Sequence, residues 1–131
     1  MRRAAVLIAC LAACYAAAAS ADARRHRIRL PNAELAHALT VDEAEWTLRP
    51  SHTVVAAGPV RIRVYNRGED DHDLLLTTHD GTPHVVALRP GEAGTITATL
   101  TPGSYQLVCS LFAGTLDSHE ARGMRFVLNV R

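Results

Sequence analysis

The stretch Gly58-Pro-Val-Arg-Ile-Arg-Val-Tyr-Asn66 decides the fold of this chain. Its residues alternate in polarity with a period of two, a pattern typical of a β-strand that buries one face. One face carries Val60, Ile62, Val64 and Asn66, and the other carries Arg61, Arg63 and Tyr65. We therefore expect a half-buried strand here.

Similar short runs lie on both sides of this stretch. Glycine and proline mark the joints between them, as in Arg89-Pro-Gly91 and Thr101-Pro-Gly103. Further strands are expected at 38–48, 53–56, 72–78, 84–88, 94–100, 104–109 and 124–130. Beyond the N-terminal segment no stretch has the pattern of a long amphipathic helix, which argues against parallel βαβ folds. The sequence predicts an all-β fold, a two-sheet Greek-key β-sandwich with seven to eight strands.

Residues 1–23 have the features of a secretory signal peptide. A basic start precedes an uncharged run at 4–19, and small-residue cleavage patterns follow at 19–23. That run is shorter than the ~20 residues that a membrane span needs. We expect a periplasmic or secreted protein with no membrane span. The alternative is a lipoprotein, because Leu11-Ala-Ala-Cys14 resembles a bacterial lipobox and would put a lipid anchor at Cys14.

Removing residues 1–23 from the 131 leaves 108, which suits one domain with one core. This part holds 12 Arg, no Lys and 12 acidic residues, so its near-zero charge gives no support for nucleic-acid binding. Residues 24–37 are basic and lack periodicity. We interpret them as an N-terminal tether, with a surface strand or a docking strip for an acidic partner as alternatives. The expected domain is 38–131.

Cys109 is the one thiol that remains after removal of the signal peptide. An unpaired cysteine in an exported domain indicates intermolecular pairing, a reactive thiol, a metal ligand or a small buried apolar side chain. His119 follows after nine residues and Met124 after four more, and His72 lies upstream. Two His, one Cys and a weak axial Met form the ligand set of a blue-copper site.

The predicted strands offer a way for these four residues to meet. His72 begins one strand, Cys109 ends another and Met124 begins the last, so strand ends at one pole would bring three of them together. The loop before Met124 would then supply His119. Taken singly, Met124 is more simply core filling, and the two histidines are more simply surface residues. Their ordered combination on a sandwich sequence favours one copper ion held by all four.

Five segments of residues 38–131 carry a family resemblance. They are Trp46-Thr-Leu-Arg-Pro-Ser51, Ala57-Gly-Pro-Val-Arg-Ile-Arg-Val-Tyr-Asn-Arg-Gly68, Asp71-His-Asp-Leu-Leu-Leu76, Pro102-Gly-Ser-Tyr-Gln-Leu-Val-Cys109 and His119-Glu-Ala-Arg-Gly-Met124. Together they resemble the cupredoxins, the small blue-copper proteins that include plastocyanin and azurin. The resemblance implies that His72 and His119 are imidazole ligands, Cys109 the thiolate and Met124 the axial thioether. It also implies an electron exit at a solvent-near histidine, here His119.

Two features depart from the family pattern. Cupredoxins usually place two to four residues between the cysteine and the second histidine, whereas nine stand here. The longer loop costs roughly 1.3 kcal/mol in closure entropy, against roughly 10 kcal/mol from metal binding. Its Leu111, Phe112 and Leu116 would cover the metal or form a partner-docking patch. Asp73 stands where plastocyanin-like members often have Asn, and an ionised carboxylate accepts but does not donate hydrogen bonds.

The resemblance implies a monomeric one-electron carrier that cycles one type 1 copper ion between Cu(II) and Cu(I), with unidentified redox proteins as donor and acceptor. The alternatives are a copper carrier or chaperone without redox turnover and a metal-free cupredoxin-like interaction domain. We expect no enzymatic activity, because Cys109 and His119 lack an orienting partner and a small sandwich offers little substrate cleft. The remaining histidines are expected at the surface, with a second labile metal site as the alternative: His26, His37, His52, His79 and His84.

Overall fold

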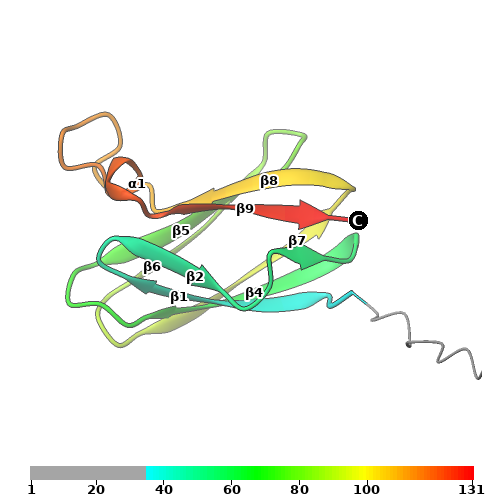
Figure 1. Cartoon of the computed structure of the whole chain (residues 1–131), viewed down its shortest axis with the longest axis horizontal. Coiled ribbons are helices and arrows are strands. Elements are labelled where there is room, and N and C mark those ends of the chain that lie inside the picture. Colours follow the sequence, from blue (N-terminus) through cyan, green and yellow to red (C-terminus); the bar gives the residue numbers. More distant parts are fainter. Residues whose placement is uncertain (1–34) are drawn as a thin grey trace, which may run out of the picture. The chain divides into compact units, whose positions relative to one another are not determined.

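The computed structural model describes residues 35–131 and contains nine strands and one short helix within them (Figure 1). The strands are β1 (Ala38–Ala44), β2 (Thr47–Pro50), β3 (Val54–Val55), β4 (Gly58–Asn66), β5 (His72–Thr77), β6 (Pro83–Leu88), β7 (Ala93–Leu100), β8 (Gly103–Val108) and β9 (Arg125–Val130). The helix α1 (His119–Arg122) precedes β9. The predicted signal peptide, the lipobox and most of the predicted tether lie outside the described residues.

The strands form two sheets, as predicted. One sheet has the order β2-β1-β4-β7, and the other has the order β3-β9-β8-β5-β6. β1 runs parallel to β4, from Ala38 opposite Arg61 to Glu43 opposite Asn66. The remaining pairs are antiparallel except for the short β3–β9 pair. The all-β sandwich is therefore confirmed.

The strand count is one above the predicted upper limit. The run at 38–48 is not one strand but a hairpin, in which β1 and β2 pair antiparallel on either side of Glu45 and Trp46. The alternation of polarity continues across this turn, so the pattern alone does not reveal the reversal. The turn matters for the site, because it brings both residues to the end of the sandwich where the predicted ligands lie.

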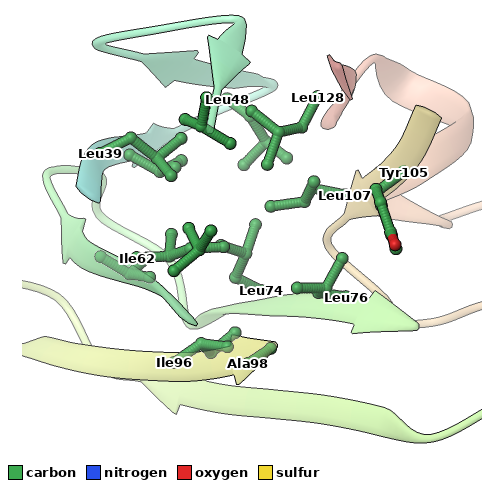
Figure 2. Close-up of a cluster of buried hydrophobic side chains, with 14 of the residues drawn as sticks. Leu39, Leu48, Ile62, Leu74, Leu76, Ile96, Ala98, Tyr105, Leu107 and Leu128 are labelled. Atoms are coloured by element: carbon green, nitrogen blue, oxygen red, sulfur yellow. The ribbon is translucent and has the colours of Figure 1, made fainter. Parts of the chain in front are cut away.

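The two sheets bury their facing side chains in one core (Figure 2). On β4 the alternation holds as expected, and Val60, Ile62, Val64 and Asn66 are all buried. Figure 2 shows Ile62 and Ile96 of one sheet facing Leu74 and Leu107 of the other. Full burial of such an aliphatic side chain contributes roughly 1.5–3 kcal/mol, so this core holds the strand ends in fixed positions.

The residues just before β1 also belong to the sandwich. The carbonyls of Ala36 and His37 accept backbone hydrogen bonds from Ala56 and Arg61 at 3.0 Å, so these residues join the sandwich. Within residues 35–131, no helix is long and apolar enough to cross a lipid bilayer.

Candidate metal centre

Three of the four predicted ligands converge at one end of the sandwich. The donor atoms of His72, Cys109 and His119 all lie within 4.8 Å of one another. The two Nδ1 atoms are 3.3 Å apart, and the Cys109 Sγ is 3.4 Å from the His119 Nδ1. All three side chains are buried, with exposed fractions of 1%, 0% and 4%. Among residues 35–131 this is the one group of three or more potential metal-binding His, Cys, Asp or Glu side chains.

Strand register explains the convergence of His72 and Cys109. β5 and β8 are antiparallel, with Leu75 opposite Val108. Cys109 directly follows Val108, and His72 lies three residues before Leu75, so both fall at the same end of the pair. The backbone N–H of Asp73 donates to the Cys109 Sγ at 3.4 Å, which links the two strands at the site.

Met124 is fully buried beside this cluster. β8 pairs with β9 with Val108 opposite Arg125, so Cys109 and Met124 are next to each other across the pair. The N–H of Cys109 donates to the Met124 carbonyl at 3.0 Å, and the N–H of Met124 donates to the His119 carbonyl at 3.0 Å. The backbone of Met124 is thus hydrogen-bonded to the backbones of both Cys109 and His119. The predicted role of its sulfur as a ligand remains a prediction.

His119 reaches the cluster as the first residue of α1, a single helical turn. Ser118 caps the turn, and its side chain accepts a hydrogen bond from the N–H of Ala121. Gly123 ends it with a φ of 126°, a conformation that favours glycine. Figure 1 shows α1 and the loop before it at the end of the sandwich opposite the C-terminus of β9.

The His119 side chain is almost entirely buried, at 4% exposed, whereas the resemblance predicts a histidine near solvent. The Trp46 ring meets the imidazole edge-on at a centroid distance of 4.9 Å, and the Phe112 ring lies at 5.4 Å. The guanidinium of Arg122 lies 4.4 Å from the centre of the Trp46 ring. Cover by Phe112 is one of the two roles predicted for the loop, but sequence reasoning missed Trp46, because the contact between the β1–β2 turn and α1 joins residues more than 70 positions apart.

Burial also sets the protonation of the metal-free site. Desolvation raises the pKa of the Cys109 thiol to about 12, so the sulfur carries a proton at neutral pH. Burial and the nearby His72 lower the pKa of His119, which favours the neutral imidazole that binds metals. A metal ion would therefore displace the thiol proton and meet histidine nitrogens that are ready to bind.

Asp73 takes the acceptor role expected of an ionised carboxylate. Its two oxygens accept hydrogen bonds from the backbone N–H and the hydroxyl of Ser110, the residue after Cys109. The backbone N–H of Asp73 meanwhile points at the Cys109 sulfur. One residue thus ties β5 to the Cys109 loop from both its main chain and its side chain, and this restricts movement of the sulfur.

The donor set fits a first-row transition metal. Ligand bonds of roughly 2.0–2.3 Å to one ion put neighbouring ligand atoms roughly 3.3–4 Å apart, and the distances of 3.3 and 3.4 Å match this spacing. One thiolate with two imidazoles, and a thioether alongside, favours copper over the hard oxygen-loving cations.

The other histidines lie elsewhere. His37 and His52 are exposed, as expected. His79 stacks on Tyr105 with ring centroids 4.2 Å apart, and its Nδ1 lies 3.3 Å from the hydroxyls of Tyr105 and Thr101. It shares a cavity with His84, but the two belong to no group of three potential ligands in residues 35–131.

Comparisons with known proteins agree with this architecture. No family model and no curated protein sequence matches the chain. A reduced auracyanin from the photosynthetic bacterium Roseiflexus castenholzii is 20% identical with a TM-score of 0.57, over 74% of this chain and 98% of that one. A reduced tryptophan-to-tyrosine mutant of amicyanin is 18% identical with a TM-score of 0.52, over 76% of this chain and 88% of that one.

An enzyme also has this fold as one of its parts. A copper-containing nitrite reductase from Thermus scotoductus SA-01 is 14% identical with a TM-score of 0.53, and the match covers 72% of this chain and 30% of the reductase. At such identities the similarity shows the fold alone. The chain has the cupredoxin fold, and the residues at one end of it fit a type 1 copper site.

Proposed function

We propose that this domain is an exported mononuclear type 1 copper protein that carries single electrons. The observation that carries the proposal is the convergence of the buried His72, Cys109 and His119 donors, with Met124 beside them. We assign the thiolate to Cys109, the imidazole nitrogens to the two histidines and the axial thioether to Met124. Bound copper would supply one-electron chemistry between its Cu(II) and Cu(I) states.

The residues around the donors favour electron transfer. Trp46 and Phe112 cover the His119 ring, and both histidine side chains are almost fully buried, so water has little access to the donors. The backbone N–H of Asp73 donates to the Cys109 Sγ, and the Asp73 carboxylate accepts from the N–H of Ser110, so Cys109 is held in place without a metal. A dry site whose ligands are already in position changes little when an electron arrives or leaves, which keeps the barrier to transfer low.

The aromatic side chains over His119 indicate where an electron would enter or leave the site. A cavity of about 690 Å³ lies over this end of the molecule, lined among others by Trp46, Leu111, Phe112 and His119. The Phe112 side chain is 60% exposed, and Leu116 in the same loop is 99% exposed. A redox partner docked here would contact the Trp46 and Phe112 rings and the part of His119 that lines the cavity.

Burial argues against the alternative of a copper carrier or chaperone. Passing the ion to another protein requires incoming ligands to reach it while the old ligands release it. Here every described donor side chain is 4% exposed or less, so a partner's ligands would have to displace Trp46 or Phe112 first. An electron needs no such opening. We therefore favour a monomeric carrier, without enzymatic activity, between unidentified donor and acceptor proteins.

Addition of Cu(II) to the purified metal-free protein tests the proposal. We expect one equivalent to bind and to produce an intense visible band from thiolate-to-copper charge transfer. The band should vanish in Cys109→Ser and His119→Ala but persist in His52→Ala, which removes an exposed histidine. Reversible cyclic voltammetry then tests redox turnover. A protein that binds Cu(I) tightly without a coloured, reversible Cu(II) form would support the carrier, and one that binds no copper would exclude both functions.

A further inference from the structure

The carboxylate of Glu45 occupies a site built for it beside His72. Glu45 lies in the turn between β1 and β2, and its Oε1 accepts hydrogen bonds from the backbone N–H groups of Glu69 and Asp70 at 2.8 and 2.9 Å. The same oxygen lies 3.1 Å from the Nε2 of His72. One carboxylate thus connects the β1–β2 turn, the loop before β5 and a predicted metal ligand.

The loop that receives this carboxylate is shaped around it. A Cβ atom on Gly68 would collide with the Glu45 Oε1, so glycine at this position leaves room for the carboxylate where it now lies. The buried Asn66 fixes the loop from inside. Its Nδ2 donates to the carbonyls of Asp70 at 2.8 Å and Leu88 at 3.0 Å, and its Oδ1 accepts from the Gly68 N–H at 2.9 Å.

The contact between the Glu45 carboxylate and His72 determines which nitrogen of the imidazole carries the proton. An ionised carboxylate only accepts hydrogen bonds, so the Nε2 of a neutral His72 must be the protonated nitrogen. The Glu45 Oε1 that faces His72 already accepts hydrogen bonds from two backbone N–H groups, so this oxygen acts as an acceptor toward the ring as well. The lone pair of His72 is then on Nδ1, the atom that lies 3.3 Å from the His119 Nδ1.

We propose that Glu45 is a positioning residue that holds His72 as its Nε2–H tautomer, with the Nδ1 lone pair directed into the metal centre. The part concerning copper rests on the proposed function, whereas the tautomer itself is a property of the metal-free protein. A carboxylate on the far nitrogen of a ligand histidine fixes the ring and makes its ligand nitrogen more basic. Extra negative charge at this position also favours Cu(II) over Cu(I).

The first test uses metal-free protein with 15N-labelled histidine. Long-range 1H–15N correlation spectra identify the tautomer of each neutral imidazole ring. The spectra are recorded about two pH units above the ordinary histidine pKa of roughly 6.5, where an ordinary ring is neutral. We expect the Nε2–H form for His72 in the wild type and in Glu45→Gln, whose amide oxygen still accepts. Glu45→Ala should populate the Nδ1–H form. Asp80→Asn is the control, because it removes the charge of an exposed acid in the turn between β5 and β6, which shares none of these contacts, and should change nothing.

The second test measures copper binding and potential in the same four proteins. Glu45→Ala should weaken copper affinity by about 10- to 100-fold and raise the midpoint potential, with Glu45→Gln raising the potential while keeping more of the affinity. An Nδ1–H tautomer in the wild type, or an unchanged tautomer in a folded Glu45→Ala protein, would overturn the inference. Absence of copper binding in the wild type would instead contradict the proposed function and leave the tautomer result valid.

Discussion

Glu43 is a buried acid, and replacing it should change how the stability of the protein depends on pH. On β1 the inward residues are Leu39, Val41 and Glu43, and the side chain of Glu43 is 0% exposed. Neither carboxyl oxygen has a hydrogen-bond partner among residues 35–131. Desolvation, helped by the negative charge of Asp73, raises the pKa of Glu43 from 4.5 to about 8. The folded protein therefore holds this carboxyl in its neutral form at pH 7.

The Glu43 carboxyl binds its proton more tightly in the folded chain than in the unfolded chain, and this difference sets the direction in which stability changes with pH. The folded chain keeps the Glu43 proton up to about pH 8, whereas the unfolded chain loses it near pH 4.5. The contribution of Glu43 to the free energy of unfolding is therefore fully present below about pH 4.5 and falls as the pH rises toward 8. At about 1.4 kcal/mol per pH unit, the loss between about pH 5.5 and 8.5 amounts to roughly 3 kcal/mol.

Urea unfolding of metal-free wild type and Glu43→Gln at these two pH values measures this loss. Glutamine has the same size and no charge, so the variant should lack this part of the pH dependence and be more stable than wild type at pH 8.5. A difference of roughly 3 kcal/mol corresponds to about 1–3 M in the urea midpoint. The exposed Glu69→Gln should shift by less than about 0.5 kcal/mol at either pH. If wild type and Glu43→Gln differ equally at both pH values, the carboxyl is not held neutral by burial and the reasoning is wrong.

Two further predictions concern the loop and the thiol. Gly68→Ala places a Cβ against the Glu45 carboxylate and should cost about 1–3 kcal/mol in unfolding free energy, and Glu45→Ala should relieve most of that cost in a double-mutant cycle. Because the pKa of Cys109 is raised to about 12, copper binding should release its proton, so the apparent copper affinity should rise about tenfold per pH unit between roughly pH 7 and 9. Calorimetry in buffers of different ionisation enthalpy counts that proton, and a pH-independent affinity would contradict the assignment of the thiolate.

The parts of this molecule that sequence predicts well depend on short-range patterns. The alternation at 58–66 is enforced by the core, so it identifies β4 and its buried face. The convergence of His72 and Cys109 was also predictable, because both are fixed by where β5 begins and β8 ends. Strand ends are local features, and antiparallel pairing carries them to the same pole.

The parts that sequence did not predict depend on contacts between distant segments. Glu43 and Glu45 stand in an acidic run that is typical of a solvent-facing surface, yet one is fully buried and the other binds His72. For Glu43 a signal was present, since it continues the inward phase of Leu39 and Val41. For Glu45 no local signal exists, because its role depends on the loop at 66–71 lying against the β1–β2 turn. The cover of His119 by Trp46 has the same origin.

The nine residues between Cys109 and His119 are compatible with a compact site because the loop folds on itself. Successive four-residue turns are closed by the N–H groups of Ala113, Thr115 and Ser118, which donate to the carbonyls of Ser110, Phe112 and Thr115 at 3.1–3.3 Å. The N–H of His119 then donates to the carbonyl of Leu111 at 3.2 Å, so the chain returns to a point two residues after Cys109.

Four such hydrogen bonds, each contributing about 0.5–1.5 kcal/mol, offset the roughly 1.3 kcal/mol of closure entropy that the additional length costs. The extra residues are therefore absorbed in a local structure on the surface, and the separation of Cys109 and His119 stays at 3.4 Å between their donor atoms. The same return explains the burial of His119, because the loop that brings its backbone to Leu111 also brings Phe112 against its ring. In this domain a longer ligand loop adds cover to the predicted metal centre while the spacing of the donors is retained.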